Sequence, residues 1–184
     1  MRLRRLGRQE GYSLPELITV MAILAIVLGA LGELFVRASN SELDLNKRFQ
    51  AQTEARQALD KVRREVHCAS VIAPASSGAI SPAANTSVTL TLPAGCPSGS
   101  GSVTWCTQGS GTRFGLYRMT GSACSGGTQY VDYLTTASVF TYYAQSTSSL
   151  AKLHVDFPVD VVPADPLRGY RLTDDIVLRN STRT

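Results

Sequence analysis

The sequence of 184 residues has few charged side chains, only two histidines, and none of the common catalytic motifs. Charged residues make up 17% of the chain, and no G-x-S-x-G, G-x-G-x-x-G, Walker A or H-E-x-x-H pattern is present. A Gly-X-Y period and a repeat of about 20–50 residues are also missing. The hydrophobic content of 43% is too high for a disordered chain. We therefore expect a folded protein that is not an enzyme and needs no cofactor.

A basic surface for nucleic acid is missing as well. The net charge is +4, but residues 1–11 hold four arginines and one glutamate, a net of +3. The remaining residues carry 14 basic and 13 acidic side chains. Nucleic-acid binding needs a stripe of Lys and Arg with interleaved aromatic residues, so we expect no direct nucleic-acid partner.

One long apolar run is present near the N-terminus. No charged residue occurs from Leu17 to Gly32, and with the flanking residues the run approaches the ~20 residues that span a bilayer. The arginines before it predict that residues 1–11 stay in the cytoplasm and that the rest is exported. Three interpretations remain open: a signal peptide cleaved after Ala30-Leu31-Gly32, a permanent signal anchor, or a segment processed on its cytoplasmic side.

The residues before the apolar run predict the start of a helix. Ser13-Leu14-Pro15-Glu16 has the pattern of a capping box, in which Ser13 is the N-cap and Glu16 reaches back from the third helical position. Pro15 fits the first turn because the N–H that it lacks would have no partner there.

The same residues carry a resemblance to a known family. Gly11-Tyr12-Ser13-Leu14-Pro15-Glu16-Leu17, between a basic leader and an apolar helix, resembles the processing motif of type IV pilins and type II secretion pseudopilins. The resemblance implies that prepilin peptidase cuts between Gly11 and Tyr12 and methylates the new N-terminus. It also implies that Glu16 acts in filament assembly by neutralising that amino group. The implied partners are the peptidase, other pilin subunits, and the inner or cytoplasmic membrane before assembly.

Helical spacing continues beyond the apolar run. One predicted face steps by three or four residues, and we expect it to be buried: Leu45, Phe49, Gln52, Ala55, Leu59, Val62 and Val66. A single helix over Leu14–Ser70 is therefore predicted. The expected organisation is a leader (1–11), a transmembrane or filament-core helix (12–33), an amphipathic helix (34–72) and an exported head (73–184).

The rest of the chain predicts an antiparallel sheet, and hence an α+β fold in which the long helix packs on the sheet. Gly- and Ser-rich turns separate six candidate strands: Ser87–Leu92, Val103–Thr107, Phe114–Met119, Val139–Ala144, Leu150–Phe157 and Tyr170–Leu178.

All four cysteines follow the apolar run, where export favours disulfides. Four cysteines allow three pairings. A meander of the first three candidate strands predicts Cys68–Cys106 and Cys96–Cys124. Zinc is not expected because no C-x-x-C pair is present. Asp174 and Asp175, with Asp156, Asp160 or Asp165, could supply oxygen ligands for calcium. Dispersed aspartates are more often surface or turn residues, so no metal site is expected.

The region around Trp105-Cys106 and Leu116-Tyr117-Arg118 is similar to the exported domains of J/W-type minor pilins. This resemblance implies a minor pilin or pseudopilin, first a single-pass membrane protein and then part of a cell-surface or periplasmic filament. The alternative is a signal-anchored surface protein whose β-rich domain binds a ligand or surface.

Overall fold

The computed structural model describes residues 11–74, 84–146, 149–162 and 169–180. The chain divides into two units, Met1–Leu45 and Asn46–Thr184, and each is described by itself. The arginines predicted to keep the leader in the cytoplasm lie outside the described residues. The helix α1 spans Leu14–Cys68, two residues shorter than predicted at its C-terminal end.

In the first unit, α1 begins where the sequence predicts. The backbone N–H groups of Glu16 and Leu17 donate to the Ser13 carbonyl oxygen at 3.0 and 3.2 Å. The side-chain hydrogen bonds of a capping box do not form between Ser13 and Glu16 in the described structure. Within the described ranges, α1 is the one helix long and apolar enough to cross a membrane.

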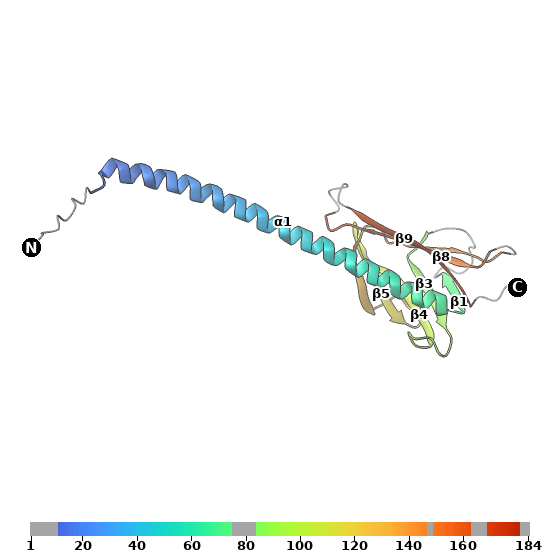
Figure 1. The fold of residues 1–184 in the computed structure, drawn as a ribbon. Helices are drawn as coiled ribbons and strands as arrows, with labels where there is room; N and C mark the ends of the chain where they lie inside the picture. The colour runs from blue at the N-terminus through green and yellow to red at the C-terminus, as the bar shows by residue number, and fades with distance from the viewer. Residues whose placement is uncertain (1–10, 75–83, 147–148, 163–168, 181–184) are drawn as a thin grey trace, which may run out of the picture. The chain divides into compact units, whose positions relative to one another are not determined.

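In the second unit, the last part of α1 packs on a curled antiparallel sheet (Figure 1). The order of strands in the sheet is β1-β3-β4-β5-β6-β8-β7-β2. β9 pairs with β8 along the edge opposite to the one that pairs with β6 and β7. The strands are β1 (Val71–Pro74), β2 (Ala84–Asn85), β3 (Ser87–Leu92), β4 (Gly101–Ser110), β5 (Arg113–Thr120), β6 (Thr128–Leu134), β7 (Phe140–Tyr143), β8 (Lys152–Val159) and β9 (Tyr170–Val177).

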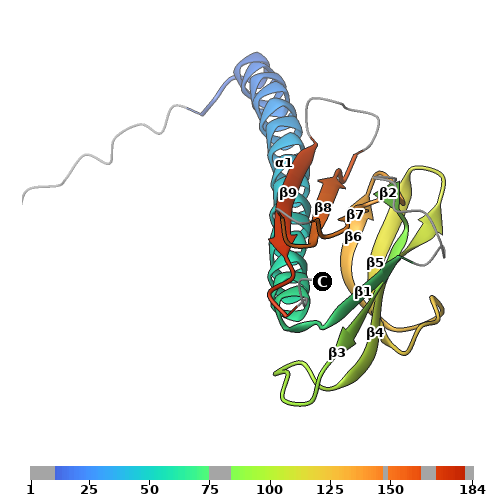
Figure 2. The ribbon, with the colours of Figure 1, turned by 90° about the vertical axis from the view of Figure 1, so that its right-hand side faces the viewer.

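The sheet curls because the segment of residues 84–92 pairs with strands at both ends of the sheet (Figure 2). β2 pairs with β7, and β3, which starts two residues after β2 ends, pairs with β1 and β4. Thr86 lies at this junction, and its carbonyl oxygen accepts the N–H of Thr107 at 2.9 Å. The Thr107 hydroxyl also donates to the carbonyl oxygen of Ala137 at 2.6 Å, which ties the junction to the segment before β7.

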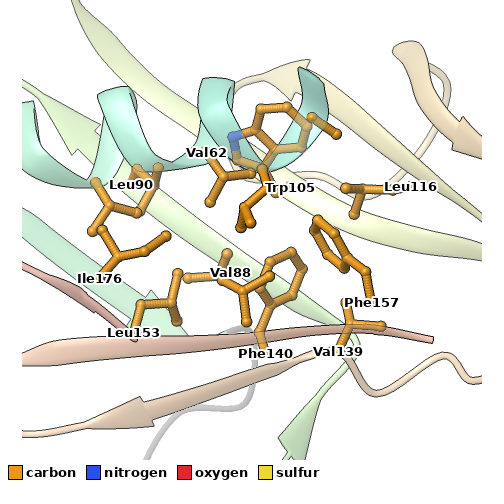
Figure 3. Packing of buried hydrophobic residues seen from close by; sticks show 14 of the residues in the cluster. Val62, Val88, Leu90, Trp105, Leu116, Val139, Phe140, Leu153, Phe157 and Ile176 are labelled. Atoms are coloured by element: carbon orange, nitrogen blue, oxygen red, sulfur yellow. The ribbon is translucent and has the colours of Figure 1, made fainter. Parts of the chain in front are cut away.

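The core lies between the last part of α1 and the inner face of the sheet (Figure 3). α1 contributes small side chains, among them the fully buried Ala55, Ala58 and Val62, which let the sheet approach closely. The sheet contributes the large ones, of which Trp105 is the largest. Small side chains on the helix that face large ones on the sheet are consistent with the close packing of buried side chains.

The α+β fold is therefore confirmed, with two differences from the sequence prediction. Leu45 and Phe49 are 63% and 73% exposed, so their predicted burial is wrong. The buried face of α1 begins at Ala51, because the sheet covers the helix only from there. The six predicted strands correspond to β3, β4, β5, β7, β8 and β9, whereas β1, β2 and β6 were not predicted.

Candidate functional site

The three described residues before α1 are open to solvent. Gly11, Tyr12 and Ser13 precede the helix and are exposed, and the Tyr12 side chain keeps 82% of its surface. Apart from Gly11 and its two chain neighbours, no atom of the described residues lies within 4 Å of the place where a side chain on Gly11 would begin. The peptide bond between Gly11 and Tyr12 is therefore accessible to another protein.

Glu16 lies in the first turn of α1 on an otherwise apolar surface. Its neighbours Leu14 and Leu17 are 73% and 55% exposed. The Glu16 backbone carbonyl oxygen accepts the Thr19 hydroxyl at 2.9 Å, but its carboxylate has no ion pair or hydrogen bond within the described residues. A cation brought close to this surface would therefore find one unpaired carboxylate.

The apolar surface extends along α1 as far as Val36. A contiguous exposed apolar surface of this extent marks a membrane or protein contact. The first charged side chains after Glu16 are Glu33 and Arg37, which form an ion pair one turn apart and are both exposed. They mark the end of the charge-free run, and the helix before them fits a membrane-anchored protein.

The second unit contains a buried charged cluster that was not predicted from the sequence. Glu65 is fully buried on α1, and its two carboxylate oxygens accept hydrogen bonds from Trp105 Nε1 at 2.7 Å and Arg118 Nε at 2.9 Å. Lys61 Nζ lies 3.7 Å from the same carboxylate. The sequence holds one signal of this cluster, since Glu65 falls three residues after Val62 on the apolar face of the helix.

The two disulfides differ from the predicted pairing. The structure pairs Cys68 with Cys96 and Cys106 with Cys124, so the expected Cys68–Cys106 and Cys96–Cys124 bonds are wrong. The reason is β1, which runs antiparallel to β3 and places the end of α1 beside the last residues of β3. Ser70 N–H donates to the carbonyl oxygen of Thr91 there, close to the loop that carries Cys96.

The second disulfide fastens the β5–β6 connection over β4. Cys106 lies on β4 and Cys124 in the connection, with 6.1 Å between their Cα atoms. The side-chain amide of Gln108 donates to the carbonyl oxygen of Gly126 at 3.2 Å, which shows that this connection folds back over the strand.

The C-terminal segment holds the end of α1. Asn180 Nδ2 donates to the carbonyl oxygen of Cys68 at 2.8 Å, and His67 Nδ1 lies 2.9 Å from the carbonyl oxygen of Val177. His67 is therefore a structural contact between α1 and β9. The end of the helix is held by a disulfide and by these two polar contacts, which restrict how the head moves on its helix.

The described aspartates among the possible calcium ligands form hydrogen bonds or ion pairs with other residues of the chain. Asp175 accepts hydrogen bonds from His154 at 2.7 Å and Lys152 at 3.0 Å, and these contacts lower the pKa of its carboxyl group. The others have separate partners, Asp156 with Arg171, Asp174 with Arg63 and Asp160 with the N–H of Val162, while Asp165 lies outside the described residues. Among the described residues, no group of three or more His, Cys, Asp or Glu is placed to hold a metal ion.

One of three comparisons with known proteins, the one with protein families, found a match, and the match lies at the N-terminal segment. No curated protein and no solved structure matches the chain. Residues 6–32 match the prokaryotic N-terminal methylation motif, which covers the exposed Gly11–Tyr12 bond, Glu16 and the apolar part of α1. The chain thus carries the prepilin-type motif of type IV pilins and pseudopilins, which are structural subunits.

Proposed function

We propose that the chain is a minor pilin or pseudopilin, a structural subunit of a type IV pilus or a type II secretion-like filament. One observation carries the proposal. Within the described residues the Glu16 carboxylate has no ion pair or hydrogen bond, and it lies on an exposed apolar helix, five residues after the accessible Gly11 that ends a basic leader. A buried or membrane-embedded carboxylate is costly unless it is paired, so such a residue is usually functional.

Processing supplies the partner for this carboxylate. Prepilin peptidase cuts between Gly11 and Tyr12 and methylates the amino group of Tyr12. An α-amino group has a pKa of about 7.7–8.0 and is largely cationic at neutral pH. Glu16 neutralises this charge, either in its own chain or in a neighbouring subunit, when the apolar helices pack together.

The proposed parts of the chain follow from this processing. Residues 1–11 are the leader, 12–33 cross the membrane and later form the filament core, 34–72 continue the helix, and 73–184 form the exported head. The leader arginines keep the N-terminus in the cytoplasm, and the disulfides of the head suit an oxidising compartment. The subunit then moves from the membrane into a cell-surface or periplasmic filament.

We further propose that the subunit is a minor one and that its role is structural and not catalytic. Support for the minor class comes from the large head with two disulfides, from the Trp105-Cys106 pattern, and from Tyr12 and Pro15 in the motif.

A substitution at Glu16 tests the proposal. Glu16→Gln removes the charge but keeps the side-chain shape, and we expect membrane insertion to continue while incorporation into filaments is lost. Glu33→Gln is the matched control, since Glu33 lies on the same helix and already pairs with Arg37. Normal incorporation of the Glu16→Gln variant would contradict the proposal and favour a signal-anchored surface protein.

A further inference from the structure

A groove separates α1 from β6 in the second unit. Two adjoining cavities of about 380 and 140 Å³ form it, and Glu54 of α1 and Asp132 of β6 line both. Its floor is apolar and buried, with Val131 under the first cavity and Ala51 under the second. The groove therefore has a buried apolar floor between two polar walls.

One wall of the groove is a strand with an unpaired edge. β6 pairs with β5 along most of its length, but on its other side it pairs with β8 only at Leu134, opposite Val159. The β5–β6 register shifts twice, and Tyr133 has a positive φ of 64°. Such irregularities redirect a strand, so β8 does not continue beside it. Just after β8, the N–H of Asp160 donates to the carbonyl oxygen of Tyr133 at 2.9 Å. Among the described strands, none pairs with the edge of residues 128–132 that faces away from β5.

The other wall is a row of polar side chains on α1. Lys47, Gln50, Glu54 and Gln57 follow one another at intervals of three or four residues, so they lie on one side of the helix. Ten residues of α-helix rise about 15 Å. Four steps of a strand rise about 13 Å, so the two walls have matching lengths and the groove suits four or five residues of extended chain.

The charge of the first cavity favours a basic guest, because its charged lining residues are Glu54 and Asp132, whereas Lys47 lines only the second cavity. Arg113 already neutralises Asp132, because its Nε donates to the carboxylate at 3.1 Å. Glu54 accepts one hydrogen bond, from Gln50 Nε2 at 3.0 Å, and has no cationic partner in the part of the chain that the structure describes. Glu54 is a lining residue of both cavities.

We propose that this groove takes an extended segment of a neighbouring filament subunit, which adds as a strand to β6 and places a Lys or Arg side chain against Glu54. Unpaired strand edges bind extended chains in this way, through main-chain hydrogen bonds and alternate side chains. The inference rests on the proposed filament function, because the neighbour is a subunit of that filament. A compact small molecule fits less well, since the groove is long and open and one wall is backbone.

Hydrogen exchange tests the proposal, because an added strand protects backbone amides. Exchange of residues 128–132 is measured by mass spectrometry for the full chain in detergent micelles and in filaments isolated from cells. We expect exchange in this segment to slow by about tenfold or more on assembly. Unchanged exchange in filaments that contain the chain would overturn the inference and leave the proposed function standing. If the chain never enters filaments, the proposed function fails and this inference fails with it.

A charge reversal tests the basic guest. Glu54→Lys should abolish the protection of residues 128–132, and Glu54→Gln should weaken it. Asp60→Lys is the matched control, because Asp60 is exposed on the same helix, lies outside the groove and makes the same change in net charge. Thermal unfolding in micelles shows whether each variant is folded. Equal protection in folded Glu54→Lys and Asp60→Lys filaments would overturn the assignment of Glu54.

Discussion

The indole N–H of Trp105 donates a hydrogen bond of 2.7 Å to the carboxylate of Glu65, and both side chains are fully buried. This contact joins α1 to β4 in the middle of the core. Arg118 on β5 supplies the opposite charge from a position that is 16% exposed. A buried carboxylate persists only when it is paired and hydrogen-bonded, so the three residues act as one unit that sets how the helix sits on the sheet.

Removing Glu65 should therefore destabilise the head strongly. Glu65→Ala leaves the Arg118 charge and the Trp105 N–H without their partner, and we expect a loss of about 3–5 kcal/mol in the free energy of unfolding. Glu65→Gln keeps an acceptor for Trp105 and should lose less. Urea unfolding of the full chain in micelles, followed by Trp105 fluorescence, measures both.

Arg64→Ala is the control for Glu65, because Arg64 is the exposed neighbour on the same helix. We expect a change within about 0.5 kcal/mol for this surface substitution. A similar small effect of Glu65→Ala would show that the buried cluster contributes nothing to stability.

The ion pair of Arg113 with Asp132, a residue that lines the groove, predicts that the stability of the protein depends on pH. Arg113 hydrogen-bonds to the Asp132 carboxylate, and this contact lowers the pKa of Asp132 below its ordinary value of 3.8. The pair therefore contributes stability above pH 3.8 that is lost as the pH falls through the lower pKa of the folded state. The carboxyl carbon resonance of Asp132, followed by NMR through an acid titration, measures this pKa.

In the Arg113→Gln variant the pKa of Asp132 should rise. The Arg113 guanidinium donates two hydrogen bonds to the Asp132 carboxylate, and its carbon atom Cζ lies 4.0 Å from the centre of the Tyr133 ring. Arg113→Lys keeps a positive charge but cannot donate both hydrogen bonds in this geometry, so it should give Asp132 an intermediate pKa. A pKa of Asp132 that is the same in all three proteins would contradict this account.

The disulfides should stabilise the head by similar amounts. The closed segments have sequence separations of 28 and 18 residues, for which loop-closure entropy gives about 3–4 kcal/mol each. The double variants Cys68→Ser/Cys96→Ser and Cys106→Ser/Cys124→Ser should each lose that much in thermal or urea unfolding. Peptide mapping without reduction checks the pairing itself, and a Cys68–Cys106 peptide would contradict the structure.

The regular parts of the fold could be predicted from the sequence because their patterns are local. α1 starts at the predicted residue Leu14, although the side-chain hydrogen bonds of the capping box do not form, and β3 occupies the predicted residues Ser87–Leu92. β6 was missed because its two register shifts break the alternation of buried and exposed residues that marks a strand. β1 and β2 were missed because they are only four and two residues long.

The remaining differences depend on contacts between segments that are distant in sequence. The disulfide pairing follows from the position of β1 beside β3, which no local pattern reports. The exposure of Phe49 follows from where the sheet stops covering α1. The groove depends on β8 leaving β6 after a single pair, and no spacing along the sequence reports that separation.

A substitution at Gly11 tests the processing step. Gly11→Val places a β-branched side chain beside the Gly11–Tyr12 bond, in a position that no other part of the described chain approaches within 4 Å apart from the two neighbouring residues, so the free protein should fold normally. We expect cleavage to slow by about tenfold or more, which corresponds to about 1.4 kcal/mol in the transition state. Immunoblotting of membranes shows the unprocessed chain. Gly29→Ala is the control, since Gly29 is equally open and should leave cleavage unchanged.

The most direct measurement is the intact mass and N-terminal sequence of the chain from membranes of cells that make it and have a prepilin peptidase. Our account predicts a mature chain that starts at Tyr12 and carries one added methyl group. A chain that keeps Met1 would contradict it and favour a permanent anchor. A chain that starts at Glu33 would contradict it too, because signal peptidase would then have removed Glu16 together with the apolar helix.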